Sequence, residues 1–273
     1  MLKDSEKKKL IRLSKSVLSE REKRAVNTVL DEGYLGMGKN VKKFEDNLSC
    51  MFNRPVATVV NGTAALHIAL QSCGIGRDDE VLVQSITYLA SFQAITASGA
   101  KPISCDIDLD TFTIDIDDAK KRLTPKTKAI MPVHYGGSLG NYEKIYKFAN
   151  EYGLRVIEDA AHAFGTTRNN KIVGSFGDIV CFSFDGIKNI TSGEGGCIVT
   201  EDKNVLNLAS DARLLGIKND TENRFKSKRS WEFEVSQQGW RYHMSDIMAS
   251  IGIVQLTKLE EFSTKRRKIA EIY

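Results

Sequence analysis

The sequence lacks three features that would assign it to a special class of protein. No apolar run approaches the roughly 20 residues that a transmembrane helix needs. The charged amino terminus, Met1 to Ser16, has no apolar core of the kind found in a signal peptide. The five cysteines are scattered, without the CxxC pairs typical of metal or redox sites, so no metal is implied. We therefore expect a cytoplasmic protein with free thiols.

A large excess of charge of one sign is also missing. The 273 residues include 39 lysines and arginines and 35 aspartates and glutamates, which gives a net charge of +4. So small a net charge does not favour a nucleic acid or an anionic membrane surface as a partner. Apolar residues make up 41% of the chain, which is enough to build a sizeable hydrophobic core.

Short apolar runs alternate with helical patterns through most of the chain. Strands are predicted at 56–60, 80–83, 102–105, 128–133, 154–157, 179–184 and 197–199, and helices at 17–32, 42–51, 63–73, 88–98, 115–123, 141–152, 203–215 and 245–273. Ser19, with Glu22 three residues later, forms a capping box for the first helix. The alternation predicts an α/β fold with a mostly parallel sheet, in which ligands gather at the carboxyl ends of the strands.

One lysine lies between two of the predicted strands. The apolar run Ile179–Phe184 is followed by a short polar loop that carries Lys188, and the glycine-rich turn Ser192–Gly196 leads into the next apolar run. An amine held rigidly at the edge of a sheet is partly desolvated, which frees its lone pair for Schiff-base chemistry. Taken alone, Lys188 is better explained as a solvated loop lysine, so the hypothesis depends on the rest of the chain.

A second strand end suits a phosphate group. Gly62, Thr63 and Ala64 open a helix directly after a predicted strand, where free amide groups and the helix dipole favour an anion. Ser183, at the end of the strand before Lys188, can add a hydroxyl to the same phosphate. Such junctions are common, and Ser183 also fits an ordinary strand position.

A third strand end suits a flat aromatic ligand. Asp159 is followed by Ala160 and Ala161, whose small side chains leave room beside it. A carboxylate in this place can pair with a protonated pyridine nitrogen, although an N-cap aspartate is the alternative explanation. Tyr88 can stack on an aromatic ring, and His162 can approach a phenolic oxygen, but both also fit ordinary packing.

Five blocks in this order resemble the DegT/StrS-type sugar aminotransferases, which are pyridoxal-phosphate enzymes of fold type I. The blocks are NGTAALHIAL (61–70), SITYLAS (85–91), VIEDAAHAFGT (156–166), FSFDGIKNITSGEGG (182–196) and YHMSDIMASIGIVQL (242–256). The resemblance runs in register from about Ile11 to Tyr273. Five ordered blocks are far more specific than any one of them.

The resemblance implies two catalytic residues, Lys188 as the Schiff-base lysine and Asp159 at the pyridine nitrogen. The implied residues that bind pyridoxal 5'-phosphate are Gly62, Thr63, Ala64, Tyr88, Asp159, His162, Ser183, Lys188 and Arg241. The implied reaction moves an amino group from an amino acid, L-glutamate, to a nucleotide-linked keto-sugar in surface polysaccharide or glycoconjugate biosynthesis. The implied active unit is a homodimer with shared active sites.

The chain departs from the family pattern in three places. Arg241 stands where the family has an Asn that reaches the phosphate of the partner subunit's cofactor, and its forked, charged donor set suits that role. Asp185 stands where an aromatic residue or His is usual. The family also continues past Tyr273 into a small C-terminal domain. We therefore expect a large cofactor-binding domain over 1–244, and a long helix over 245–273 that begins a truncated C-terminal domain.

Two other interpretations stay open. Gly136–Gly140 matches GxSxG, the nucleophile elbow of α/β-hydrolases, with Ser138 as the nucleophile and Asp159 and His243 later in the chain. The other alternative is a non-catalytic domain, shortened at its carboxyl end, that binds the cofactor or a partner. A dehydratase offshoot of the family has His at the lysine position, and Lys188 argues against it.

Overall fold

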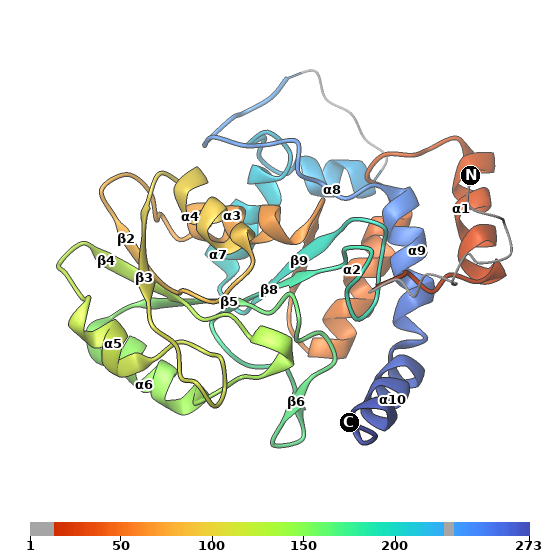
Figure 1. Cartoon of the computed structure of the whole chain (residues 1–273). Coiled ribbons are helices and arrows are strands. Elements are labelled where there is room, and N and C mark those ends of the chain that lie inside the picture. The colour runs from red at the N-terminus through yellow and green to blue at the C-terminus, as the bar shows by residue number, and fades with distance from the viewer. Residues whose placement is uncertain (1–13, 227–231) are drawn as a thin grey trace, which may run out of the picture.

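A seven-stranded sheet forms the centre of the computed structural model, which describes residues 14–226 and 232–273 (Figure 1). In the order β1-β9-β8-β5-β4-β2-β3, the strands are Val56–Val59, Gly196–Thr200, Ile179–Ser183, Arg155–Asp159, Thr127–Met131, Glu80–Gln84 and Lys101–Cys105. Neighbouring strands are parallel except along β9, which runs antiparallel to β1 and β8. The predicted α/β fold with a mostly parallel sheet is confirmed.

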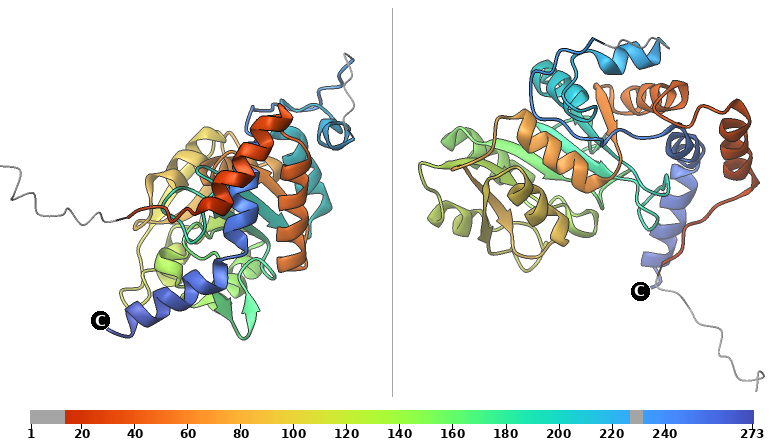
Figure 2. Two further views of the ribbon diagram at one scale, coloured as in Figure 1. Left: turned by 90° about the vertical axis from the view of Figure 1, so that its right-hand side faces the viewer. Right: turned by 90° about the horizontal axis from the view of Figure 1, so that it is seen from above.

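Helices cover both faces of the sheet (Figures 1 and 2). One face carries α3 (Gly62–Ser72), α4 (Leu89–Ala97) and α7 (Lys203–Ala212), and the other carries α2 (Lys39–Phe52), α5 (Ile116–Lys121) and α6 (Tyr142–Tyr152). Successive strand residues point to opposite faces, so Val81 and Val83 pack under α3 and α4 while Leu82 packs with α5 and α6. Because both faces are covered, β1, β8 and β9 are buried along their whole length, whereas the edge strand β3 is partly exposed.

The remaining elements lie at the margins of these layers. They are α1 (Glu20–Glu32), α8 (Asp220–Phe225), α9 (Asp246–Leu256), α10 (Leu259–Ala270), the hairpin of β6 (Thr167–Arg168) with β7 (Lys171–Ile172), and a 3₁₀ turn at Tyr135–Gly137. The capping box is confirmed, because the Ser19 amide donates to Glu22 Oε2 over 2.8 Å and the Arg21 amide donates to Ser19 Oγ over 3.3 Å. All five cysteines are free thiols, as predicted. Within the described ranges, no helix is both long and apolar enough to cross a membrane.

The single helix predicted over 245–273 is wrong, because the chain forms α9 and α10 with a break between them. The amides of Thr257 and Lys258 bond to carbonyls three residues back, at Val254 and Gln255, rather than four. Lys258 Nζ also reaches across to Glu22 Oε1, 2.5 Å away on α1. The apolar periodicity of this stretch predicts helix on both sides of the break, but it carries no information about this distant contact.

Glu22 joins α1 to the junction of α9 and α10. Its side chain is buried at 2% exposure. Burial favours the neutral acid, but hydrogen bonds from Lys258, Ser19 and Gln255 outweigh it and lower the pKa of Glu22 to about 2. A carboxylate with a lowered pKa stabilises the fold above its unfolded-state value of 4.5, and that stability is lost as pH falls toward about 2.

We expect Glu22→Gln to lower the free energy of unfolding by about 2–3 kcal/mol at pH 7. The difference from the unmodified chain should shrink as the pH falls from 4.5 toward about 2, because the native carboxylate then takes up a proton. Urea unfolding at pH 7 and near pH 3 measures the difference. Glu20→Gln, at an exposed position on the same helix turn, is the matched control. A loss of equal size at both pH values would contradict the assignment.

Candidate active site

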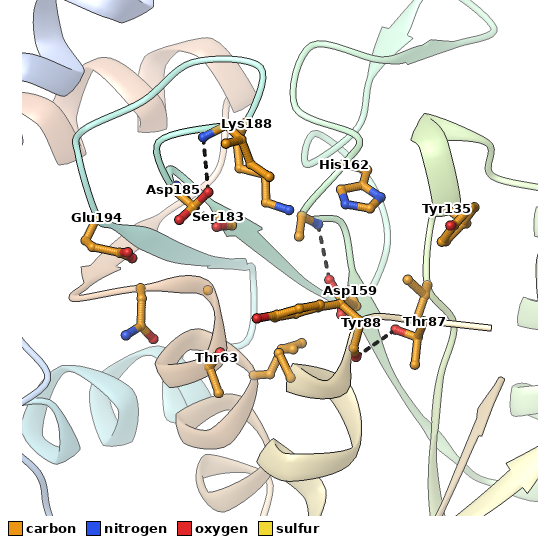
Figure 3. Close-up of a pocket in the computed structure, with 17 residues that line it drawn as sticks. Thr63, Thr87, Tyr88, Tyr135, Asp159, His162, Ser183, Asp185, Lys188 and Glu194 are labelled. Atoms are coloured by element: carbon orange, nitrogen blue, oxygen red, sulfur yellow. Dashed lines mark hydrogen bonds between the residues drawn. The ribbon is translucent and has the colours of Figure 1, made fainter. Parts of the chain in front are cut away.

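The carboxyl ends of β1, β2, β4, β5 and β8 meet at one edge of the sheet, around a cavity of about 640 Å³ (Figure 3). The predicted site residues that line it are Gly62, Thr63, Tyr88, Asp159, His162, Ser183 and Lys188. Only Ala64 and Arg241, among the predicted residues, are absent from the lining. The rule that ligands gather where parallel strands end therefore brings together positions from four separate segments of the chain.

The amino end of α3 forms one wall of the cavity. An added Cβ at Gly62 would lie 2.8 Å from Ser183 Cβ, so only glycine permits this approach of helix and strand. Asn61 caps the helix by accepting from the Ala64 amide over 2.8 Å, which means that this amide is not free for a phosphate as expected. The amides of Gly62 and Thr63 have no partner among the described residues. They leave an anion site beside the Ser183 hydroxyl.

Asp159 ends β5 with its carboxylate at the cavity and 5% of the residue exposed. Its Oδ2 accepts from Ser91 Oγ over 2.7 Å, and its Oδ1 accepts from the Ala161 amide over 3.2 Å. Ser91 Oγ in turn lies 2.7 Å from Thr87 Oγ1. Sequence reasoning missed Ser91, although its position four residues after Thr87 at the start of a helix places the two hydroxyls on one face.

His162 lies near Asp159 at the cavity (Figure 3). Its Nδ1 accepts from the Gly136 amide over 3.4 Å, and its ring lies 5.8 Å from that of Tyr135, a cavity residue that sequence reasoning did not find. Burial and the charge of Lys188 lower the pKa of His162. The neutral ring is therefore favoured, and its Nε2 carries the proton and can donate to a ligand oxygen.

Lys188 is half-buried in the loop between β8 and β9. Asp185 holds this loop, because its carbonyl accepts from the Lys188 amide over 3.1 Å and its Oδ1 accepts from the Ile187 amide over 3.0 Å. The side chain of Lys188 extends from the loop into the cavity, toward Asp159 and His162 (Figure 3). Its Nζ has no hydrogen-bond partner in the described part of the chain. This arrangement argues against an ordinary solvated loop lysine.

The cavity is rich in acidic groups. Its charged lining residues are the carboxylates of Asp159, Asp185 and Glu194 and the ammonium of Lys188. Burial and the neighbouring carboxylate of Asp185 raise the pKa of Glu194. Sequence reasoning missed Glu194 as a cavity residue, although it lies in the glycine-rich turn after Lys188. A phosphate bound here would still need a positive counter-charge from elsewhere.

Arg241 lies outside the cavity of its own chain and is exposed. Its backbone pairs with Leu214, and the next carbonyl, that of Tyr242, accepts from the Val60 amide over 2.6 Å. The flanking rings of Trp240 and Tyr242 stack 5.6 Å apart. Arg241 is therefore held on a structured segment next to the strand that leads into the anion site, and its side chain has no hydrogen-bond partner in residues 14–226 and 232–273.

The nucleophile elbow predicted at Ser138 is wrong. Ser138 has ordinary extended backbone, with φ −74° and ψ 132°, and follows the 3₁₀ turn at Tyr135–Gly137 instead of a strand. No hydrogen bond joins any two of Ser138, Asp159 and His243 in the described residues. Burial, followed by nearby arginines, lowers the pKa of His243 to about 4, so this ring is a weak base. The GxSxG match is a turn sequence in this fold.

Comparisons with known proteins find relatives that match nearly the whole chain. The model of the DegT/DnrJ/EryC1/StrS aminotransferase family matches residues 16–273. GDP-perosamine synthase of Escherichia coli O157:H7 is 40% identical over 258 residues, which are 94% of this chain and 68% of that protein. The spore coat polysaccharide biosynthesis protein SpsC of Bacillus subtilis is 36% identical over 94% of this chain and 66% of its own length. The chain thus spans about two thirds of these relatives.

Solved structures share the fold over nearly the whole chain. The aminotransferase TlmJ from Streptoalloteichus hindustanus superposes with a TM-score of 0.88 at 34% identity, over 97% of this chain and 70% of that one. A putative sugar aminotransferase of Streptococcus pneumoniae, Spr1654 in its PMP-form, gives 0.88 at 30% identity, over 96% and 69%. The chain belongs to the DegT/DnrJ/EryC1/StrS aminotransferase family, and its fold is that of the pyridoxal-phosphate aminotransferases of fold type I.

Proposed function

We propose that this protein transfers an amino group from an amino acid, L-glutamate, to a nucleotide-linked keto-sugar with pyridoxal phosphate as cofactor. The observation that carries the proposal is the unpaired amine of Lys188 in one cavity with Asp159 and the free amides of α3. The relatives named for GDP-perosamine synthesis and spore coat polysaccharide biosynthesis support a sugar acceptor and a role in polysaccharide biosynthesis. The five free thiols suit a reducing compartment such as the cytoplasm.

The lining residues match the parts of the cofactor. The amides of Gly62 and Thr63 and the Ser183 hydroxyl would bind the phosphate, and Asp159 would hold a proton on the ring nitrogen. Tyr88 is 73% exposed and lines the cavity, so its ring is available to stack on the cofactor. The small side chain of Ala161 leaves space beside Asp159 for a flat ring.

Lys188 has two tasks in this proposal. Pyridoxal phosphate, when bound, supplies a carbonyl group that takes up amines and a ring that withdraws electrons. The Lys188 amine would hold the cofactor covalently. When it is not bonded to the cofactor, the same amine would be placed to take up and return a proton at the substrate carbon.

Covalent labelling tests the proposal directly. The chain, mixed with pyridoxal phosphate and reduced with borohydride, should carry the phosphopyridoxyl group on Lys188 in peptide mass mapping. Failure to take up the cofactor, or a label on a different lysine, would overturn the proposal. A non-catalytic cofactor-binding domain would carry the same label but would not exchange its amino group with glutamate. A fluorophosphonate should leave Ser138 unlabelled.

We further propose that the active unit is a dimer in which Arg241 reaches the phosphate site of the neighbouring subunit. Lys188 is the one lysine or arginine among the described residues that line the cavity, while Arg241 lies on an exposed, structured segment outside its own cavity. A two-fold axis would complete both sites at once. The forked guanidinium suits a phosphate in a site that excludes water.

Mixing inactive variants tests this sharing of sites. Lys188→Ala and Arg241→Ala should each be inactive alone but recover roughly a quarter of the unmodified activity after subunit exchange, because half of the dimers are hybrids with one intact site. Each variant incubated alone is the control. If exchange is shown by differently sized tags and activity does not return, Arg241 serves its own subunit or none.

A further inference from the structure

Ser91 is the single polar side chain on the buried face of α4. That face otherwise consists of Ala94 and Ile95, which are packed into the main core cluster. The whole of Ser91 is buried, at 0% exposure. A hydroxyl in such surroundings is costly unless it is hydrogen-bonded. Its partner is the carboxylate of Asp159, 68 residues away in the sequence, which points to a role beyond the packing of α4.

The direction of the hydrogen bonds around Ser91 is determined by chemistry. An ionised carboxylate only accepts, so the single hydroxyl proton of Ser91 must go to Asp159 Oδ2. Thr87 Oγ1 lies 2.7 Å from Ser91 Oγ and 3.3 Å from the Tyr88 carbonyl, and since the Ser91 proton is already used, only a proton donated by Thr87 to Ser91 satisfies the shorter contact. Thr87 is half-buried and lines the cavity. A directed chain therefore runs from Thr87 through Ser91 to Asp159.

This chain leaves the Asp159 carboxylate with one defined orientation. Ser91 occupies one lone pair of Oδ2, and the Ala161 amide occupies one lone pair of Oδ1. One acceptor position on each oxygen remains for a ligand in the cavity. Without Ser91, the carboxylate would be held by a single amide contact of 3.2 Å and would be free to turn about its terminal torsion.

We propose that Ser91 is a positioning residue, with Thr87 as its donor, that holds the Asp159 carboxylate toward the cofactor ring nitrogen and thereby keeps the proton on that nitrogen. The proposal rests on the proposed role of Asp159 in pyridoxal-phosphate binding. It adds two residues of this chain that do not touch the reacting atoms, and it assigns them a measurable effect on the protonation of the ring. A well-oriented carboxylate favours the protonated ring because the pair is charge-assisted.

The experiment uses the holoprotein loaded with ¹⁵N-labelled pyridoxal phosphate, whose ring-nitrogen chemical shift reports protonation independently of turnover. In Ser91→Ala the shift should move toward that of the unprotonated ring, and the dissociation constant of the cofactor should rise about tenfold. Ser91→Thr keeps a hydroxyl and should restore both values. Ser98→Ala is the matched control, because that hydroxyl ends the same helix and makes local hydrogen bonds, to the Ile95 carbonyl and from the Ala100 amide.

A ring-nitrogen shift in Ser91→Ala equal to that in Ser98→Ala would overturn the proposal, even if stability fell. If Ser91→Ala does not fold, Thr87→Val tests the proposal instead, because it removes the hydroxyl that donates to Ser91 but keeps the buried serine. Its nitrogen shift should move in the same direction by a smaller amount, and an unchanged shift would contradict the directed chain. Failure of the proposed function has a different signature, because the unmodified chain would then show no bound, protonated ring at all.

Discussion

Replacing Lys188 with alanine should lower the rate of amino transfer by about 10³-fold or more and leave the fold intact. In the proposed mechanism this amine moves the proton at the substrate carbon, and Lys188 Nζ has no hydrogen-bond partner in the described part of the chain that would hold it elsewhere. The loop around it should survive, since Asp185 holds the turn through backbone amides rather than through the lysine side chain.

Lys188→Arg should be as inactive as Lys188→Ala. It keeps the positive charge, but a guanidinium does not release its proton in proteins and cannot serve as the base. Single-turnover absorbance changes with glutamate measure the loss, and thermal unfolding by circular dichroism checks the fold. Small primary amines added to the solution should restore part of the rate in Lys188→Ala, where space is left, but not in Lys188→Arg.

Lys203→Ala is the control for these substitutions, because Lys203 is an exposed lysine at the start of α7, outside the cavity lining. It should retain the rate of the unmodified chain. Retention of amino transfer within tenfold by Lys188→Ala, at an unchanged melting temperature, would remove Lys188 from the mechanism.

Glu45→Ala should lower the free energy of unfolding by about 3–5 kcal/mol, because it leaves a buried guanidinium without its counter-charge. Arg213 is 1% exposed, and its Nη1 donates to Glu45 Oε1 over 2.5 Å and to the Thr58 carbonyl over 2.6 Å. Glu45 Oε1 also accepts from the Thr58 amide over 2.8 Å. Glu45 on α2 and Arg213 in the segment after α7 therefore both bind Thr58 in the middle of β1, the strand that leads into the anion site.

Equilibrium unfolding in urea, without cofactor, measures this loss. Asp46→Ala is the matched control on the same helix, because the Asp46–Lys42 pair is exposed and should contribute less than about 1 kcal/mol. The double variant Glu45→Met, Arg213→Met should recover part of the loss, since it removes both charges and not one. If Glu45→Ala lowers the free energy of unfolding no more than Asp46→Ala does, Arg213 does not need Glu45 as its counter-charge.

The sequence by itself determined those features that depend on interactions between near neighbours. The alternation of strands and helices, the Ser19–Glu22 capping box and the placement of Lys188 between two strands all follow from periodicity, caps and turns within a few residues. The prediction that polar strand ends would converge is confirmed as well, because parallel strands place their carboxyl ends at one edge.

Only the tertiary structure decided the contacts that cross long stretches of chain. Ser91 contacts Asp159, 68 residues away in the sequence. Lys258 contacts Glu22, 236 residues away, at the break between α9 and α10, where the apolar pattern predicts one continuous helix. Such pairs leave no local signal, since a buried serine or a paired lysine has the same neighbours in sequence as an unpaired one. The packing of the helices and strands determines which residues become partners. A buried polar group without a partner would lower the free energy of unfolding by a large fraction of its total.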